Sequence, residues 1–192
     1  VFAAMDGVVR HVNSHPGESS YGRYIVIGHP GATPAIYTLY AHLKSVEPGI
    51  RAGVPVRRGQ VIAVMGHSAG GYAIPRDRAH LHFEMGLMIT EGFQRWYDAK
   101  KFGSPNQQGV WNGMNLMGFD PRAFFTEYEA RRVDDVIDFL RRQPVAVRFR
   151  VAASRVPDFA RRYPALVKGE LPLGLVGGWE IECLWTGLPV SL

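Results

Sequence analysis

Short apolar runs separated by glycine and proline turns fill the first two-thirds of the chain. The run Tyr24–Ile27 ends at Gly28, the run Ala35–Tyr40 follows it closely, and Gly59–Gly66 encloses a third. Such runs, bounded by turn residues, are typical of β-strands. Because they follow one another without helical patterns between them, they favour an antiparallel sandwich or barrel over alternating strand and helix units.

The composition sets outer limits on the fold and on partners. The chain has 192 residues, of which 46% are hydrophobic and 20% charged, which is enough for one well-buried domain or a domain with a small annex. No apolar run approaches the length of a transmembrane segment. The single cysteine, Cys183, excludes an internal disulfide. The net charge of +5 favours anionic partners, but the arginines are scattered, so we expect a solvated basic surface and no nucleic-acid partner.

The residue pattern of the sequence changes twice after the first strands. A long polar and aromatic stretch, about residues 87–117, is too long for a routine hairpin and predicts a functional insertion or an ordered flap. We therefore predict a β domain over residues 1–125 that contains this insertion, and a small α/β annex over residues 126–192 whose role is unknown.

The annex shows one helical and two strand patterns. Its helical face comprises Val133, Val136, Ile137 and Leu140, and Pro144 ends the helix. Apolar residues then alternate with Arg148 and Arg150, which predicts a half-buried strand from about 145 to 151. Residues 179–185 alternate in the same way.

The pair His80 and His82 is the strongest chemical signal. Alternate residues of a strand point to one face, so an H-x-H pattern on a strand places two imidazoles side by side. Two neighbouring imidazoles resist being charged together, and a metal ion or a proton-transfer site gives such a pair a use. A surface pair on a half-exposed strand is the alternative.

Three strings together give the pair a context. They are Tyr40-Ala-His42-Leu43, the glycine-bounded run from Gly59 to Gly66, and His80-Leu-His82-Phe-Glu84. With the A-x-x-D-G opening at residues 3–7, and in this order, they resemble the lysostaphin/LytM-type zinc endopeptidases of peptidase family M23, over about residues 1–125.

The resemblance implies a fold, a reaction and site residues. The fold is an antiparallel β-sandwich of the duplicated hybrid motif type, with a groove across one sheet. The reaction is zinc-dependent hydrolysis of peptide cross-links in bacterial peptidoglycan, outside the cytoplasmic membrane. The resemblance makes His82 a zinc ligand, and it makes His42 and His80 the catalytic residues that handle protons and the developing oxyanion.

One departure from the family pattern affects the metal. The family completes its zinc site with an H-x-x-x-D motif ahead of the D-G turn, and residues 1–5 contain neither ligand, while Asp6 belongs to the turn itself. We expect the sequence to be part of a longer product whose upstream part supplies the motif and an export signal. The alternative is a metal-less module that binds cell wall or regulates another hydrolase. A phosphocarrier of the sugar phosphotransferase type shares the opening, but the two histidine strings argue against it.

The remaining polar candidates have simpler interpretations. We expect surface positions for His11, His15 and His29, and a groove-edge position for His67 is a lesser alternative to a plain loop residue. Glu84 lies two residues after His82, on the same face, where it serves either as an outer partner of the ligand or in a salt bridge. Three further expectations are Asp77 as a loop carboxylate, Asp120 as a helix cap, and Trp96, Tyr97 and Trp111 as packing residues of the insertion or as a binding wall.

Overall fold

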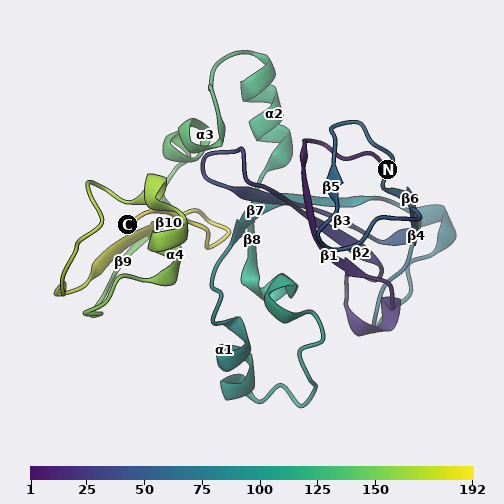
Figure 1. Ribbon diagram of the computed structural model, residues 1–192, viewed down its shortest axis with the longest axis horizontal. Coiled ribbons are helices and arrows are strands. Elements are labelled where there is room, and N and C mark those ends of the chain that lie inside the picture. The colour runs from purple at the N-terminus through teal and green to yellow at the C-terminus, as the bar shows by residue number, and fades with distance from the viewer.

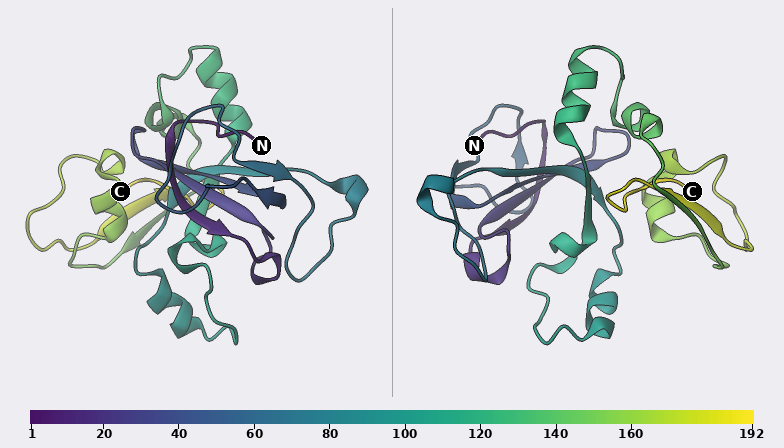
Figure 2. Two further views of the ribbon diagram at one scale, coloured as in Figure 1. Left: turned by 45° about the vertical axis from the view of Figure 1, so that its right-hand side comes forward. Right: turned by 180° about the vertical axis from the view of Figure 1, so that it is seen from behind.

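The computed structural model describes residues 1–192 and is mostly antiparallel β, as predicted (Figures 1 and 2). Its strands are β1 (Gly7–Asn13), β2 (Tyr24–His29), β3 (Ile36–Ala41), β4 (Leu43–Val46), β5 (Pro55–Val56), β6 (Ala63–Met65), β7 (His82–Met88), β8 (Leu116–Phe119), β9 (Val147–Val151), β10 (Trp179–Cys183) and β11 (Pro189–Ser191). Its α-helices are α1 (Phe93–Lys100), α2 (Pro121–Glu129), α3 (Val136–Arg142) and α4 (Asp158–Arg162). Short 3-10 turns are η1 (Pro16–Glu18), η2 (Arg76–Arg78), η3 (Gly109–Trp111), η4 (Gly113–Asn115) and η5 (Pro164–Leu166).

A six-stranded sheet forms the centre of the molecule. Its strand order is β5-β1-β2-β3-β7-β8, and every neighbouring pair is antiparallel. The ribbon β4-β6 is a separate two-stranded sheet. An apolar cluster joins this ribbon to one face of the large sheet, and its buried members are Ala3, Val9, Ile25, Ile27, Tyr40, Leu43, Ile50, Val56, Ile62 and Ala63. The predicted layering of β-strands around one apolar core is therefore present.

The other face of the sheet is covered by the insertion between β7 and β8. Both strands extend into the range predicted for the insertion, residues 87–117. The inserted segment itself is therefore residues 89–115, and it carries α1, η3 and η4. Leu116 and the half-buried Trp111 pack on Val26 and Leu39, which belong to a second apolar cluster. The insertion is thus an ordered cover over one part of the sheet.

The C-terminal residues share a core with the sheet. One hydrophobic cluster includes Met85 and Leu87 of β7 together with Leu140, Phe159 and Leu188. The boundary expected after residue 125 lies inside α2, and α2 is capped by Asp120, whose side chain accepts from the backbone N–H groups of Arg122 and Ala123. The cap prediction is confirmed, while the division into two units stays a prediction. No helix is both long and apolar enough to cross a membrane.

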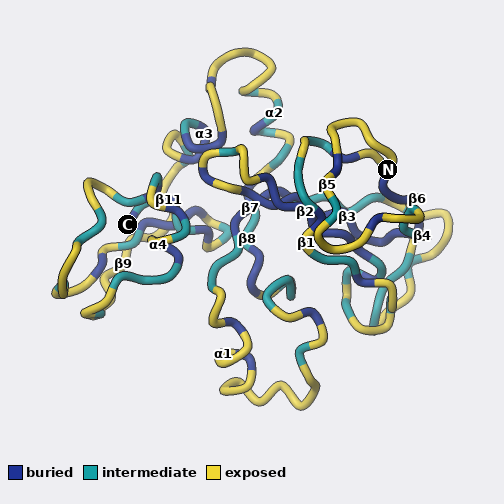
Figure 3. Tube along the Cα trace, in the orientation of Figure 1, coloured by how far each residue is buried: buried dark blue, intermediate teal, exposed yellow.

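The strand predicted near residues 145–151 forms, but the prediction that it is half-buried is wrong. Every residue of β9 is exposed, and 43% of Phe149 remains accessible. The reason is its place in the order β11-β10-β9, where it is an edge strand whose apolar row has no layer against it. Figure 3 shows exposed tube near the label of β9.

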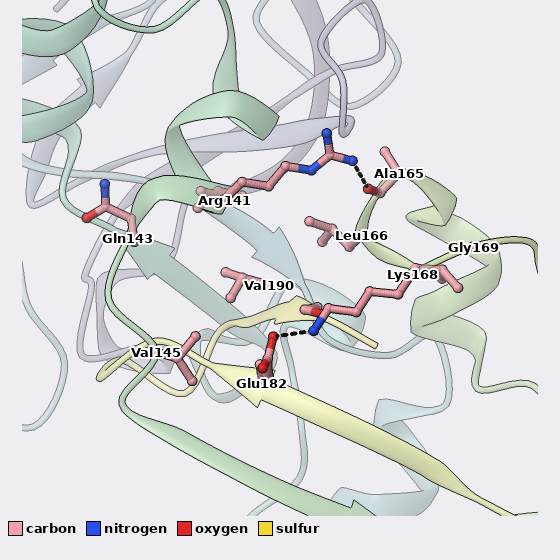
Figure 4. A pocket seen from close by; sticks show the side chains of 12 residues that line it. Arg141, Gln143, Val145, Ala165, Leu166, Lys168, Gly169, Glu182 and Val190 are labelled. Atoms are coloured by element: carbon pink, nitrogen blue, oxygen red, sulfur yellow. Dashed lines mark hydrogen bonds and ion pairs between the residues drawn. The ribbon is translucent and has the colours of Figure 1, made fainter.

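A buried carboxylate links the strands of the annex. Glu182 in β10 accepts hydrogen bonds from Lys168 and from Arg148 of the neighbouring β9, and only 9% of its side chain is accessible. These hydrogen bonds, that of Lys168 first, lower the pKa of Glu182 from the ordinary 4.5 to about 2. The residue lines a cavity of about 390 Å³ between α3, η5 and β11, and Figure 4 shows the Lys168 contact.

This lowered pKa predicts a pH-dependent contribution to stability. The folded pKa lies below the unfolded one, so the contribution is fully present above pH 4.5 and is lost as the pH falls from about 4.5 to 2. In thermal unfolding, the advantage in Tm of the native chain over Glu182→Gln should shrink across that window. Glu170→Gln, at an exposed carboxylate without an ion pair, is the control and should follow the native chain; a constant Glu182→Gln difference would contradict the assignment.

Candidate functional site

The three histidines of the two strings converge at one end of the sheet. Ala41 of β3 pairs directly with His82 of β7, so His42, the residue after β3, emerges beside His82. The ring centroids of His42 and His80 are 5.0 Å apart, and those of His42 and His82 are 5.7 Å apart. The expectation that H-x-H lies on a strand needs correction: β7 starts at His82, and His80 precedes it. The third ring, from the end of β3, completes the cluster.

The backbone of His42 is held in a rare conformation. Its φ is 59°, in the left-handed region that residues other than glycine seldom occupy, and its N–H donates to the carbonyl of Tyr21 over 2.9 Å. Such positions persist only where surrounding contacts fix them, and they cluster at functional sites. Here the conformation turns the chain between β3 and β4 and places the imidazole against His80 and His82.

Hydrogen bonding also fixes the proton on the His42 ring. Its Nδ1 lies 2.8 Å from the carbonyl oxygen of Ser68, which only accepts, so Nδ1 carries the hydrogen and the neutral ring has its lone pair on Nε2. Burial lowers the pKa of His42; the Ser68 contact opposes this, and His80 and His82 reinforce it. His42 is therefore a neutral base at neutral pH.

The loop that receives His42 is anchored at Ser68. The hydroxyl of Ser68 donates to the carbonyl of Leu43 and accepts from the backbone N–H of Arg23, at 2.8 and 2.9 Å. Gly22 makes this close approach possible, because a Cβ there would lie 2.2 Å from the Ser68 carbonyl oxygen. Its φ of 64° also favours glycine.

The substitution Gly22→Ala tests this anchor. At a positive φ, alanine costs about 1–2 kcal/mol of stability, and the overlap with Ser68 should add about 1–3 kcal/mol. Gly49→Ala is a matched control, since Gly49 has a φ of 87° but no atom within 4 Å of where a Cβ would lie. Urea unfolding should show the larger loss for Gly22→Ala, with a shifted imidazole resonance of His42. Equal losses would show that the approach to Ser68 does not matter.

His82 is oriented by Glu84. Its Nε2 lies 2.7 Å from Oε1 of Glu84, whose carboxylate also accepts from the hydroxyls of Tyr21 and Tyr37 at 2.7 and 3.0 Å. Burial alone would raise the pKa of Glu84, but the hydrogen bonds from His82, Tyr21 and Tyr37 outweigh it, so the pKa is lowered. An ionised carboxylate only accepts, hence Nε2 carries the hydrogen and Nδ1 is the free donor atom. This is the arrangement in which a carboxylate orients a metal-binding histidine.

His80 is the most exposed of the three rings. Its Nδ1 lies 2.9 Å from the carbonyl oxygen of Arg78, so in the neutral ring the lone pair is again on Nε2. His42 and His80 thus have the same tautomer, held in both cases by a backbone carbonyl, whereas His82 has the opposite one. The difference separates one candidate ligand from two candidate proton carriers.

The residues present do not form a complete metal site. No group of three or more histidine, cysteine, aspartate or glutamate side chains is placed to hold a metal ion. The residues present fit a zinc ion only in part. His82 has a free lone pair on Nδ1, whereas the carboxylate of Glu84 is already hydrogen-bonded to His82, Tyr21 and Tyr37. A zinc ion in a catalytic site takes three protein ligands.

The structure corrects the expectations for two other histidines. His29 is buried rather than on the surface, with Nδ1 and Nε2 each 2.8 Å from a partner, the carbonyl of Asp6 and the hydroxyl of Thr38. Its place between Gly28 and Pro30, at the end of an apolar run, indicated a surface turn instead. His11 is a half-buried residue of β1 whose Nε2 contacts Gln108 of the insertion at 2.8 Å.

The other polar candidates lie closer to expectation. His15 is exposed, and Asp77 lies in η2 without an ion pair among the salt bridges of the structure. His67 is exposed in the loop after β6, where its Nδ1 contacts the carbonyl of Ile74 at 2.9 Å. None of these three joins the cluster of His42, His80 and His82.

The aromatic residues of the insertion mainly pack. Tyr97 is buried against Phe93 and Phe102, and Trp96 packs on the same two rings while 42% of it stays exposed. Trp111 accepts a hydrogen bond at its carbonyl from Tyr24. Packing is therefore the observed role, in preference to a binding wall.

Sequence reasoning missed the tyrosines that hold Glu84. Tyr21 and Tyr37 are separated from Glu84 by 63 and 47 positions. A single signal was available: Tyr37 and Glu84 belong to neighbouring strands whose register the Y-A-H-L and H-L-H strings fix. Gln108, which contacts His11 and Tyr24, carried no signal at all.

Comparison with known proteins agrees with this geometry. Residues 1–91, which contain His42, His80 and His82, match the family model described as Peptidase family M23. The similarity to this family thus extends over just under half of the chain. No curated protein matches the chain.

Solved structures of peptidases resemble parts of the chain. A zinc-containing peptidase from Vibrio cholerae is 36% identical over 42% of this chain and 21% of its own, with a TM-score of 0.32. A putative glycyl-glycine endopeptidase LytM from Ruminococcus gnavus is 31% identical over 45% and 33%, with a TM-score of 0.37. Lysostaphin from Staphylococcus simulans is 14% identical over 95% and 66%, with a TM-score of 0.42. The chain spans about a fifth and a third of the length of the first two.

Proposed function

We propose that this protein is a zinc-dependent endopeptidase that hydrolyses peptide cross-links of bacterial peptidoglycan. The observation that carries the proposal is the convergence of His42, His80 and His82, with one ring prepared as a ligand and two as bases. The match of residues 1–91 to the model of peptidase family M23 supports hydrolysis of a peptide bond. The resemblance of the two histidine strings to those of lysostaphin/LytM-type enzymes supports a cell-wall substrate.

In this proposal His82 contributes one zinc ligand through Nδ1. Glu84 keeps the hydrogen on Nε2 and holds the ring plane, and the two tyrosines keep Glu84 in place and ionised. The remaining ligands are the histidine and aspartate of the H-x-x-x-D motif that the family resemblance implies, and residues 1–192 do not supply them.

His42 and His80 then handle the protons of the hydrolysis. A neutral imidazole takes a proton from the attacking water at Nε2, and His42, whose pKa burial lowers, is in the right state for this. The second imidazole, His80, would in its protonated form donate from Nε2 to the developing oxyanion, and the proton that His42 took from the water would pass to the leaving amine. Both rings have Nδ1 bonded to a backbone carbonyl, which leaves Nε2 as the atom that accepts or donates a proton.

A second candidate is a module without metal that binds cell wall or regulates another hydrolase. The observation that favours it is the lack of any three-donor group among residues 1–192. Under this alternative the histidines would be a binding surface. The two functions differ in one measurable respect, which is cleavage of the peptide bond.

Hydrolysis of purified peptidoglycan by the protein expressed from its whole gene separates the two. We expect release of cross-linked peptides that a chelator and His82→Ala abolish, because both remove the metal. His42→Ala should keep the metal but lower kcat by about 10²–10⁴-fold, as loss of a general base does. His15→Ala, at an exposed histidine outside the cluster, is the control. Cleavage that survives both chelator and His82→Ala would refute the zinc mechanism, and binding without cleavage would favour the module.

Metal analysis of residues 1–192 alone gives a second prediction. One prepared imidazole with two neighbours held as bases cannot match a site of three protein ligands, so zinc should be lost on dialysis to well below one equivalent. The fold should persist without it, because the core strands do not depend on the metal. Stoichiometric zinc after extensive dialysis, lost again in His42→Ala or His80→Ala, would show a site built from these residues.

The proposed substrate also sets a proposed location. Cross-linked peptidoglycan lies outside the cytoplasmic membrane, so we place the protein in an extracytoplasmic compartment of a bacterium, with peptidoglycan peptides as its partner. The gene sequence ahead of Val1 tests this, since the proposal requires an export signal and the H-x-x-x-D motif there.

A further inference from the structure

A cleft of about 570 Å³ lies directly beside the histidine cluster. It is bounded by Leu43 and Lys44 at the start of β4, by His67 and Ser68 after β6, and by Arg76 of η2. Two features join it to the site: Leu43 follows His42 in the chain, and the carbonyl of Ser68 accepts from the His42 ring. The loop with η2 projects from this end of the sheet, and the annex lies at the opposite end (Figures 1 and 2).

The charge of this cleft is of one sign. Arg23, Lys44 and Arg76 line it together with His67, and no aspartate or glutamate does. None of the three cations forms an ion pair. Cations left without partners along one concave wall focus a positive potential on whatever enters.

One of these cations, Arg23, is held by the backbone. Its guanidinium donates to the carbonyls of Ser14 and Lys44 at 3.2 and 3.3 Å, and it pairs with no carboxylate. Gly66 lets the end of β6 lie against Lys44, since a Cβ there would be 2.5 Å from the Lys44 nitrogen. The cleft is thus built by close backbone contact.

We propose that this cleft binds a carboxylate group of the peptide whose bond is cut at the histidine cluster. The inference rests on the proposed function for the identity of the peptide, but the charge of the cleft stands apart from it. A peptide lying across the histidines extends about 3.3 Å per residue, so a carboxylate one to three residues from the cut bond can reach the neighbouring cleft. The cleft then selects acidic stem peptides over neutral bridges such as oligoglycine.

Binding to residues 1–192 tests the inference without hydrolysis. The probes are a peptidoglycan stem tetrapeptide with free carboxylates, the same peptide with its carboxylates amidated, and inorganic phosphate. We expect the free peptide to bind more tightly than the amide, to weaken with added salt, and to shift the amide resonances of Lys44, His67 and Arg76. Lys44→Gln and Arg76→Gln should each weaken it about twofold to fivefold, the range of an exposed ion pair.

Arg51→Gln is the matched control, because Arg51 is exposed, forms no ion pair and lies outside the cleft. It should leave the affinity for the free peptide unchanged. Equal binding of free and amidated peptides, or equal effects of Arg51→Gln and Arg76→Gln, would overturn the inference. Phosphate that binds as tightly as the free peptide would also overturn it, by assigning the cleft to a phosphate group.

The outcome separates this inference from the proposed function. If the whole-gene protein does not cleave peptidoglycan but residues 1–192 prefer the free peptide, the enzyme proposal fails and the carboxylate cleft remains. If the protein cleaves free and amidated cross-links at the same kcat/KM, the enzyme proposal stands and the cleft has no part in selecting substrate.

Discussion

The pairing of β3 with β7 is the contact on which the rest of the site depends. Its register sets Ala41 opposite His82 and Leu39 opposite Glu84. A shift by one residue would turn His82 and Glu84 to the opposite face of the sheet, because side chains alternate. The apolar residues of β3 hold the register, since Tyr40 belongs to one buried layer and Leu39 to the other. The chemistry is therefore fixed by burial on both faces of one strand.

Glu84 shows how the cost of a half-buried charge is offset. Desolvation opposes ionisation of its carboxylate, and hydrogen bonds from His82, Tyr21 and Tyr37 outweigh that cost. Two of these donors stay protonated: the pKa values of the Tyr21 and Tyr37 hydroxyls are raised, with burial the first cause. His82 is consequently held in a single tautomer by a network that joins β3, β7 and the loop before β2.

Much of this could be predicted from the sequence, and the exceptions have physical causes. The strands followed from short apolar runs bounded by turn residues, and the grouping of His42 with the H-x-H pair followed from the family resemblance of two short strings, although His80 precedes β7. The burial of His29 could not be predicted from its neighbours Gly28 and Pro30, because it depends on partners from Asp6 and Thr38 that the fold brings together. The exposure of β9 was missed for the opposite reason: alternation shows that a strand has an apolar row, but it does not show whether another layer covers that row.

The insertion explains why the approach to the site is one-sided. It covers the part of the sheet face formed by Tyr24, Val26 and Leu39, where Leu116 and Trp111 complete a buried cluster. A peptide cannot lie along that part of the sheet without displacing packed side chains. At the histidine end, His80 remains exposed. The open direction from the histidines therefore leads along the loop with η2, into the cleft where Lys44 and Arg76 have no partner of opposite charge.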